Sequence, residues 1–184
     1  MNHNGLLIVL VIAIVTVIAL GFWLIRKRRS QKLQERFGPE YDRVVKREGD
    51  VRKAEDVLAF REKRREKFKL YPLSPEDKSS YELMWDEIQN RFVDDPKEAV
   101  TQADRLVERV MHARGYPMGE FDQRAADISV DYPVVVENYR AAHEIALRHS
   151  RGQASTEDLR KAMVHYRTLF RQLLDKQTLL RKEA

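Results

Sequence analysis

The chain begins with an uninterrupted apolar run. Leu6 to Ile25 reads LLIVLVIAIVTVIALGFWLI, 20 residues without a charged side chain. At about 1.5 Å per residue, a helix of this length spans about 30 Å, the thickness of a bilayer's hydrocarbon core. Strands seldom exceed about ten residues, and in lipid only a helix satisfies its own backbone hydrogen bonds within one segment. The run therefore predicts a transmembrane helix over residues 6–25, preceded by a short tail, residues 1–5.

A cleaved signal peptide is the alternative interpretation of this run, because Ala19-Leu20-Gly21 resembles a small-x-small cleavage site. Against cleavage, the tail has no Lys or Arg, and the apolar run continues to Ile25, where Arg26-Lys27-Arg28-Arg29 follows at once. Positive charge beside a membrane span stays on the cytoplasmic side. We therefore expect an uncleaved, single-pass anchor whose tail faces outward and whose residues 26–184 lie in the cytoplasm.

From residue 70 onward, apolar positions recur with the period of an α-helix. They form four stripes: Tyr81, Met84, Trp85, Ile88 and Phe92; Ala99, Val100, Ala103, Leu106, Val107, Val110 and Met111; Val135, Val136, Tyr139, Ala142, Ala146 and Leu147; and Leu159, Met163, Tyr166, Phe170 and Leu173. No stretch alternates with period two for long enough to be a strand. The pattern predicts an all-α fold, with a four-helix antiparallel bundle over residues 70–184.

Polar residues and glycines mark the ends of these helices. A capping residue followed by acids, with or without proline, predicts a helix start at Ser74-Pro75-Glu76-Asp77, Asp95-Pro96-Lys97-Glu98 and Ser155-Thr156-Glu157-Asp158, and more loosely at Asp131-Tyr132-Pro133. Gly115 and Gly152 each follow a basic residue, as is typical of glycines just past a helix end. The bundle helices are therefore joined by short connections.

Residues 26–69 form a different kind of segment, called here the neck. It holds 17 Lys and Arg against 9 Asp and Glu, whereas residues 70–184 hold 17 against 20. Phe37-Gly38-Pro39 is expected to end the helix that leaves the membrane. Beyond it, a mostly charged helical segment has only a thin apolar line, formed by Val44, Val51, Ala54 and Leu58. A helix this polar is either a solvated spacer or one half of a contact.

Six basic residues lie close to the predicted membrane span: Arg26, Lys27, Arg28, Arg29, Lys32 and Arg36. This basic cluster acts as a topology signal, and it is also our candidate contact with anionic lipid headgroups, at about 1 kcal/mol per basic residue. Nucleic acid is disfavoured as a partner because aromatic residues are not interleaved with these charges and the bilayer competes for them.

Composition excludes several kinds of chemistry. With no cysteine, the chain has no disulfide, thiolate metal site or cysteine nucleophile. His143-Glu144 resembles the start of H-E-x-x-H, but the next histidine is His149, about 240° further around a helix, so the two rings leave on different faces. The seven glycines form no phosphate-binding motif. We expect no metal, no cofactor and no catalytic residue.

The stretch from residue 115 to residue 133 is the most individual part of the bundle sequence. It combines two aromatic-proline pairs with several acids, and one interpretation is an exposed surface for a protein partner. The residues of this candidate surface are Tyr116, Glu120, Phe121, Asp122, Asp127, Asp131 and Tyr132. The other interpretation is a long connection that packs over the bundle and contains a short helix around residues 121–127.

Four segments resemble a family of uncharacterised bacterial proteins with one N-terminal span and a helical soluble part. They are RFGPEYDRVV (36–45), RGYP (114–117), FDQRAADISVDYPVVVENYRAAH (121–143) and AMVHYRTLF (162–170). The resemblance implies a bacterial inner membrane location and supplies no activity, ligand or catalytic residue. We therefore expect a membrane-anchored helical interaction or scaffold protein. The alternative is a membrane protein that binds anionic lipid or nucleic acid through its neck, and an enzyme with a site inside the bundle comes third.

Overall fold

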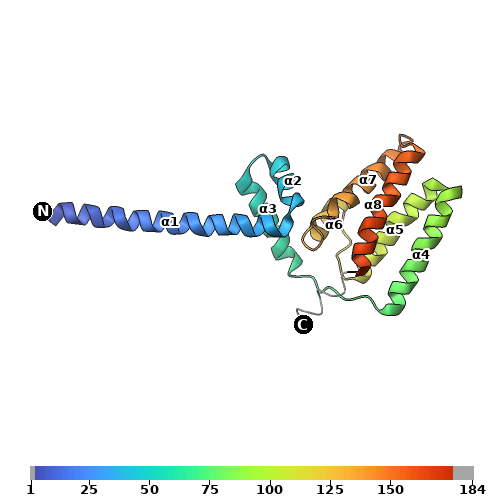
Figure 1. Cartoon of the computed structure of the whole chain (residues 1–184), viewed down its shortest axis with the longest axis horizontal. Helices are drawn as coiled ribbons and strands as arrows, with labels where there is room; N and C mark the ends of the chain where they lie inside the picture. Colours follow the sequence, from blue (N-terminus) through green and yellow to red (C-terminus); the bar gives the residue numbers. More distant parts are fainter. Residues whose placement is uncertain (1–2, 176–184) are drawn as a thin grey trace.

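The computed structural model describes the backbone of residues 3–175 and the side chains of residues 12–175. Every regular element in this range is an α-helix, which confirms the predicted all-α class. The first helix, α1 (His3–Phe37), extends away from the others as a long rod (Figure 1). It ends where the sequence predicts, because Gly38 has a positive φ of 47°, which glycine tolerates, and Pro39 begins the next helix.

The neck is folded rather than extended. After α1, the helices α2 (Pro39–Glu48) and α3 (Val51–Arg65) form a hairpin that lies against the C-terminal part of α1. Gly49 ends α2 with a φ of 68°, and Asp50 begins α3 because its carboxylate accepts a hydrogen bond from the backbone N–H of Lys53 at 2.9 Å. The neck is therefore a three-helix unit.

The three-helix unit packs around a hydrophobic core that is separate from the main core of the bundle. Its members are Leu33, Phe37, Tyr41, Val44, Ala54, Leu58 and Val130. Three of the four predicted apolar positions are buried, whereas Val51 is 48% exposed because it is the first residue of α3, beside the turn. Val130 comes from the bundle, so the neck and the bundle share this core. The neck is one half of a contact and not a solvated spacer.

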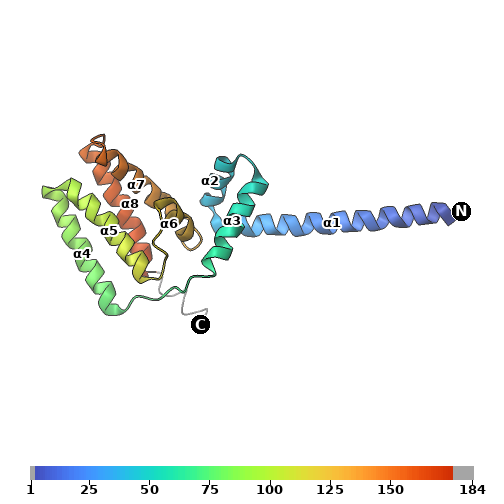
Figure 2. The same cartoon turned by 180° about the vertical axis from the view of Figure 1, so that it is seen from behind.

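Five helices follow the neck: α4 (Pro75–Asp94), α5 (Pro96–Ala113), α6 (Phe121–Ile128), α7 (Val136–Ser150) and α8 (Thr156–Asp175). The two hairpins, α4 with α5 and α7 with α8, meet where α5 packs on α8. The short helix α6 lies beside α7 at the side that faces the neck (Figure 2). The four long helices occupy the four predicted stripes, and α6 is the short helix predicted around residues 121–127.

Three of the four predicted start signals are confirmed by their hydrogen bonds. In each, a side-chain oxygen of the capping residue accepts from a backbone N–H three residues later: Ser74 from Asp77 at 3.0 Å, Asp95 from Glu98 at 3.1 Å and Ser155 from Asp158 at 3.2 Å. Gly115 and Gly152 follow α5 and α7 with φ values of 89° and 71°, as predicted. The local chemistry of these segments thus determines where the bundle helices begin and end.

The fourth signal, Asp131-Tyr132-Pro133, is wrong as a helix start. Helix α7 begins later, at Val136, and the residue before it, Val135, provides no side-chain cap. The carboxylate of Asp131 instead accepts hydrogen bonds from Arg65 and Tyr116. The sequence pattern predicts that the carboxylate of Asp131 caps a helix, but this carboxylate binds Arg65 of the neck instead.

The bundle core follows the predicted stripes closely. All seven predicted positions of α5 and all five of α8 are buried. Trp85 of α4 stacks on Phe170 of α8 with ring centroids 4.8 Å apart. One position is wrong: Leu147 is 45% exposed, and Ile145 is buried in its place. The buried face of α7 therefore differs from the predicted one near the C-terminal end of the helix.

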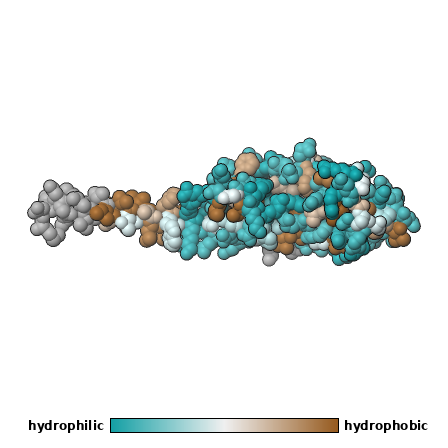
Figure 3. Space-filling model, turned by 90° about the horizontal axis from the view of Figure 1, so that it is seen from above, coloured by the Kyte–Doolittle hydropathy of each residue, from teal (hydrophilic) through white to brown (hydrophobic). Residues whose placement is uncertain are grey.

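No helix in the described part of the chain is both long enough and apolar enough to cross a membrane. Residues 6–11 of the predicted span lie outside the described side chains. The transmembrane assignment of residues 6–25 therefore stays a prediction. In the described part of α1, apolar side chains such as Phe22 and Ile25 are 68% and 70% exposed, and hydrophobic residues gather where α1 leaves the polar body (Figure 3).

Candidate functional site

Ion pairs join the end of α3 to α6 and to the turn that follows α6. Arg64 donates from Nε to Asp127 Oδ1 at 2.8 Å, and Arg65 donates from Nε to Asp131 Oδ2 at 2.5 Å. The same oxygen of Asp131 accepts from the hydroxyl of Tyr116 at 2.7 Å. The arginines of the neck thus meet the acids of the stretch 115–133, which is how the basic neck attaches to the more acidic bundle.

Glu40 is a fully buried carboxylate where α2, α3 and α7 meet. It accepts from Arg61 Nη1 at 2.6 Å and from the guanidinium of Arg140 at 2.7 and 2.8 Å, while Arg61 also donates to the Ser129 hydroxyl at 3.0 Å. Burial by itself would raise the pKa of Glu40, but hydrogen bonds and positive charge from Arg140 and Arg61 outweigh it and lower that pKa. Glu40 therefore stays ionised and connects the neck to the bundle.

The predicted acidic-aromatic partner surface is wrong as a free surface. Tyr116, Asp127 and Tyr132 are buried, with exposed fractions of 2%, 1% and 4%. Asp131 is half-buried against the neck and Phe121 against α7, and only the remaining two residues, Glu120 and Asp122, are exposed. The physical reason has two parts: Arg64 and Arg65 of the neck bind Asp127 and Asp131, and Tyr116 and Tyr132 belong to the hydrophobic core of the bundle. The sequence did not indicate Glu40, Arg61 or Arg140, because the contact joins residues up to 100 positions apart.

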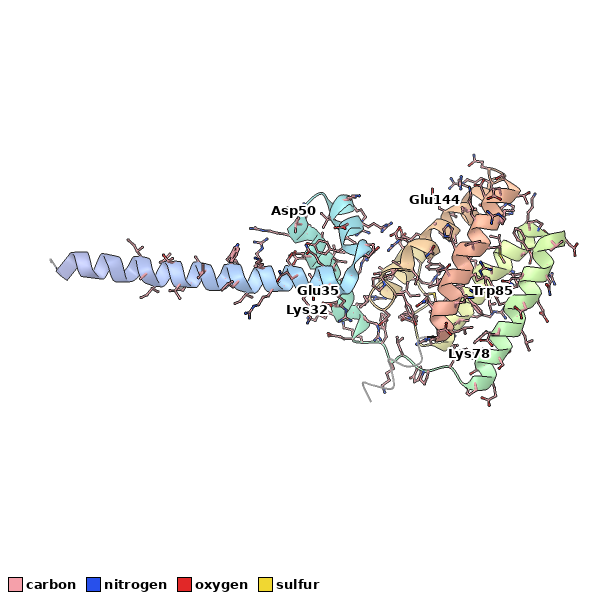
Figure 4. The ribbon with its side chains drawn as sticks, in the orientation of Figure 1. Lys32, Glu35, Asp50, Lys78, Trp85 and Glu144 are labelled. Atoms are coloured by element: carbon pink, nitrogen blue, oxygen red, sulfur yellow. The ribbon has the colours of Figure 1, made fainter. Side chains whose placement is uncertain are left out.

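Some residues of the basic cluster form contacts within the neck, and others are exposed to solvent. Arg29 pairs with Asp56 of α3 at 3.1 Å, and Arg36 pairs with Glu62 of α3 at 3.0 Å. Lys27 lies over the ring of Trp23, 5.1 Å from its centroid. Arg28 and Lys32 are exposed, and Lys32 projects from α1 beside the hairpin (Figure 4). The sixth residue, Arg26, lines a groove.

This arginine groove lies between α1 and α3 and has a volume of about 270 Å³. It is lined by Phe22, Ile25, Arg26, Arg29, Arg52, Glu55 and Asp56. Its three arginines come from two helices and lie beside the exposed apolar side chains at the end of the predicted span. Arg52 is the member that the sequence did not indicate, because it is 23 residues beyond the last arginine of the run 26–29.

A second groove, the aromatic groove, lies between α4 and α8 and has a volume of about 120 Å³. It is lined by Trp85, Gln89, Phe92, Arg160, Met163, Val164 and Arg167. Trp85 forms part of its floor and is held there by its stacking on Phe170 and by a hydrogen bond from its Nε1 to Gln89 Oε1 at 2.7 Å. The labelled Trp85 side chain lies between α4 and α8 in Figure 4. The groove thus combines apolar walls with two arginines.

Two histidines of the bundle are held by neighbouring side chains. His143 stacks on Phe121 with ring centroids 3.5 Å apart, and His165 Nδ1 lies 2.7 Å from Asn138 Oδ1. Burial lowers the pKa of His143, and together with the positive charge of Arg124 it outweighs the acids Asp104 and Glu108 of α5, which raise that pKa. Within residues 12–175, no group of three or more His, Asp or Glu side chains could hold a metal ion.

Acidification is expected to destabilise the protein through His143. Because burial lowers its pKa below the ordinary value of 6.5, the unfolded chain binds more protons than the folded one between the two pKa values. Stability should therefore fall as the pH drops from about 7.5 to about 5.5, and His143→Gln should reduce that slope. His165, whose pKa burial also lowers, accounts for part of the remaining slope.

Urea unfolding at both pH values measures the slope. His112→Gln is the matched control, because His112 is an exposed histidine of the same bundle. Equal slopes for the wild type and His143→Gln would show that His143 is as easily protonated in the folded protein as in the unfolded chain.

Comparisons with protein-family models, with curated proteins and with solved structures find no match for this chain.

Proposed function

We propose that this protein is a membrane-anchored helical interaction protein that presents the aromatic groove to a protein partner. The observation that carries the proposal is the groove itself, where Val164 is 40% exposed beside the buried Trp85. An apolar groove between two helices suits an amphipathic segment of another protein. Arg160 and Arg167 favour acidic side chains on that segment.

Anchoring is the second part of the proposal. It is supported by the 20 uncharged residues 6–25 and by the basic run Arg26-Lys27-Arg28-Arg29 directly after them. The charge distribution favours a cytoplasmic neck and bundle, and the resemblance described above favours a bacterial inner membrane. The buried ion pairs of Glu40 then hold the bundle in a fixed relation to the anchor.

The second candidate function is the binding of anionic lipid through the neck, and the arginine groove is the observation that favours it. Nucleic-acid binding by the neck has less support, because Arg61, Arg64 and Arg65 are engaged by bundle residues.

The test is photo-crosslinking of the full-length chain in bacterial cells, followed by recovery of adducts from the membrane fraction. A photoreactive residue at Val164 should form a discrete adduct with a protein. The same residue at Leu83 should not, because Leu83 is exposed on the face of α4 about 200° away from Trp85.

Charge-reversal variants of α8 test whether the adduct forms at the aromatic groove. Arg167→Glu should reduce the Val164 adduct about tenfold or more, because like charges across an interface repel. Lys161→Glu makes the same charge change on an exposed position of α8 outside the groove and should leave the adduct unchanged. Equal adducts from both variants would contradict the groove as the binding surface, and adducts found only in the soluble fraction would contradict anchoring.

A further inference from the structure

The arginine groove is formed where the basic part of α1 passes the beginning of α3. Its cations are Arg26 and Arg29 from α1 and Arg52 from α3. We propose that this groove binds the phosphate group of an anionic phospholipid, with Arg26 and Arg52 as its principal cationic ligands. The inference rests on the proposed anchoring through residues 6–25 and assigns a lipid site to the neck.

The two carboxylates that line the groove already have partners within the neck. Asp56 Oδ1 accepts from Arg29 at 3.1 Å, and Glu55 Oε1 accepts from the hydroxyl of Tyr41 at 3.0 Å. Among the residues whose side chains are described, neither Arg26 nor Arg52 forms a direct ion pair. The groove thus has three guanidinium groups against two carboxylates, and those of Arg26 and Arg52 are the ones without a direct ion pair. Guanidinium is the side-chain group best matched to phosphate oxygens.

The apolar wall of the groove indicates which phosphate compound fits. Phe22 and Ile25 are about two-thirds exposed and adjoin Arg26. In a phospholipid, the glycerol and acyl chains continue from the phosphate and cover such a wall, whereas a free phosphate has nothing to place there. A nucleic acid would need several aromatic side chains interleaved with the cations, and the groove has one.

The position of the groove along α1 agrees with this assignment. Phe22 and Ile25 are among the last residues of the predicted span, and Arg26 is the first charged residue after it. A groove at this point lies at the level of the lipid headgroups. Arg52 reaches the same level only because the α2–α3 hairpin brings the first turn of α3 back beside α1 (Figure 4, where Asp50 labels the turn).

Native mass spectrometry of the full-length protein in detergent micelles tests the proposal, with phosphatidylglycerol and phosphatidylcholine as the probes. We expect a complex with one phosphatidylglycerol and markedly weaker binding of phosphatidylcholine. Arg52→Ala should weaken phosphatidylglycerol binding about fivefold, the effect of one basic residue at a lipid surface. Lys53→Ala is the matched control, because it removes one charge from an exposed neighbouring position of α3 outside the groove.

Equal weakening by Arg52→Ala and Lys53→Ala, or equal binding of both lipids, would overturn the site. Displacement of the lipid by glycerol phosphate at the same concentration would assign the groove to a free phosphate compound instead. Alkaline extraction of cell membranes tests the anchoring separately. Release of the protein at high pH would contradict the anchor. The comparison of Arg52→Ala with Lys53→Ala is made in micelles and does not depend on that result.

Discussion

Replacing Glu40 with glutamine is expected to lower the free energy of unfolding of the neck–bundle unit by about 3–5 kcal/mol. The side chain of Glu40 is fully buried, and those of its partners Arg61 and Arg140 are only 6% and 14% exposed. Glutamine keeps the shape of the side chain but loses its charge, so the guanidinium of Arg61 stays desolvated without a compensating anion. Arg140 keeps only its ion pair with Glu137, at 2.8 Å. Removing one partner of a buried ion pair costs more than the pair contributes, because the remaining charge has lost its water.

Hydrogen exchange and urea unfolding of the full-length chain measure this effect. Amides of α2, α3 and α7 should lose protection in Glu40→Gln, because Glu40, Arg61 and Arg140 come from these three helices. Asp42→Asn is the matched control: it removes one negative charge from an exposed position of the same helix and should change stability by less than about 0.5 kcal/mol. Unchanged protection in Glu40→Gln would mean that the neck does not depend on this network for its position.

Truncating Phe170 to alanine is expected to cost about 3–5 kcal/mol of bundle stability. Phe170 is 2% exposed, and its ring stacks on Trp85 with an interplanar angle of 21°. The substitution removes buried apolar surface, leaves a cavity between α4 and α8, and takes away the support of the aromatic groove. The aromatic pair adds to the cost of the lost burial.

Thermal or urea unfolding, followed by near-ultraviolet circular dichroism of the tryptophans, reports on Phe170→Ala. Val164→Ala serves as the control, because Val164 lies on the same helix and is 40% exposed. Its cost should be below about 1 kcal/mol. A loss of less than about 1 kcal/mol for Phe170→Ala would contradict the assignment of Phe170 to the core.

The parts of the fold that depend on local chemistry could be predicted from the sequence. The end of α1 at Gly38 and the caps at Ser74, Asp95 and Ser155 involve residues within a few positions of one another, so the sequence contains all of their determinants. The buried faces of α5 and α8 follow from apolar spacing for the same reason. The prediction that Leu147 is buried was wrong, and Ile145 is buried instead, because burial near a helix end depends on the neighbouring helices.

The interface between neck and bundle could not be predicted in the same way. Arg65 and Asp131 are 66 positions apart, and Arg140 and Glu40 are 100 apart. The charges of both segments were visible in the sequence, and the prediction that the polar neck helix forms half of a contact was right in kind. Nothing in the order of residues paired particular arginines with particular acids. Asp127 and Asp131 were therefore assigned to an exposed partner surface, whereas Arg64 and Arg65 of the neck bind them.

The unbroken course of α1 has a mechanical consequence under the proposed anchoring. Twelve helical residues, 26–37, separate the end of the apolar run from Gly38, a rise of about 18 Å. A flexible linker of that length would let the bundle change its orientation and its distance relative to the membrane. Here Phe37 is buried in the neck core, and Glu40 of the next helix forms an ion pair with Arg140 of α7. Helix α1 therefore acts as a rigid spacer of fixed length. If the chain is anchored as proposed, a tilt of α1 turns the whole bundle with it, and the aromatic groove is held at one distance from the lipid surface.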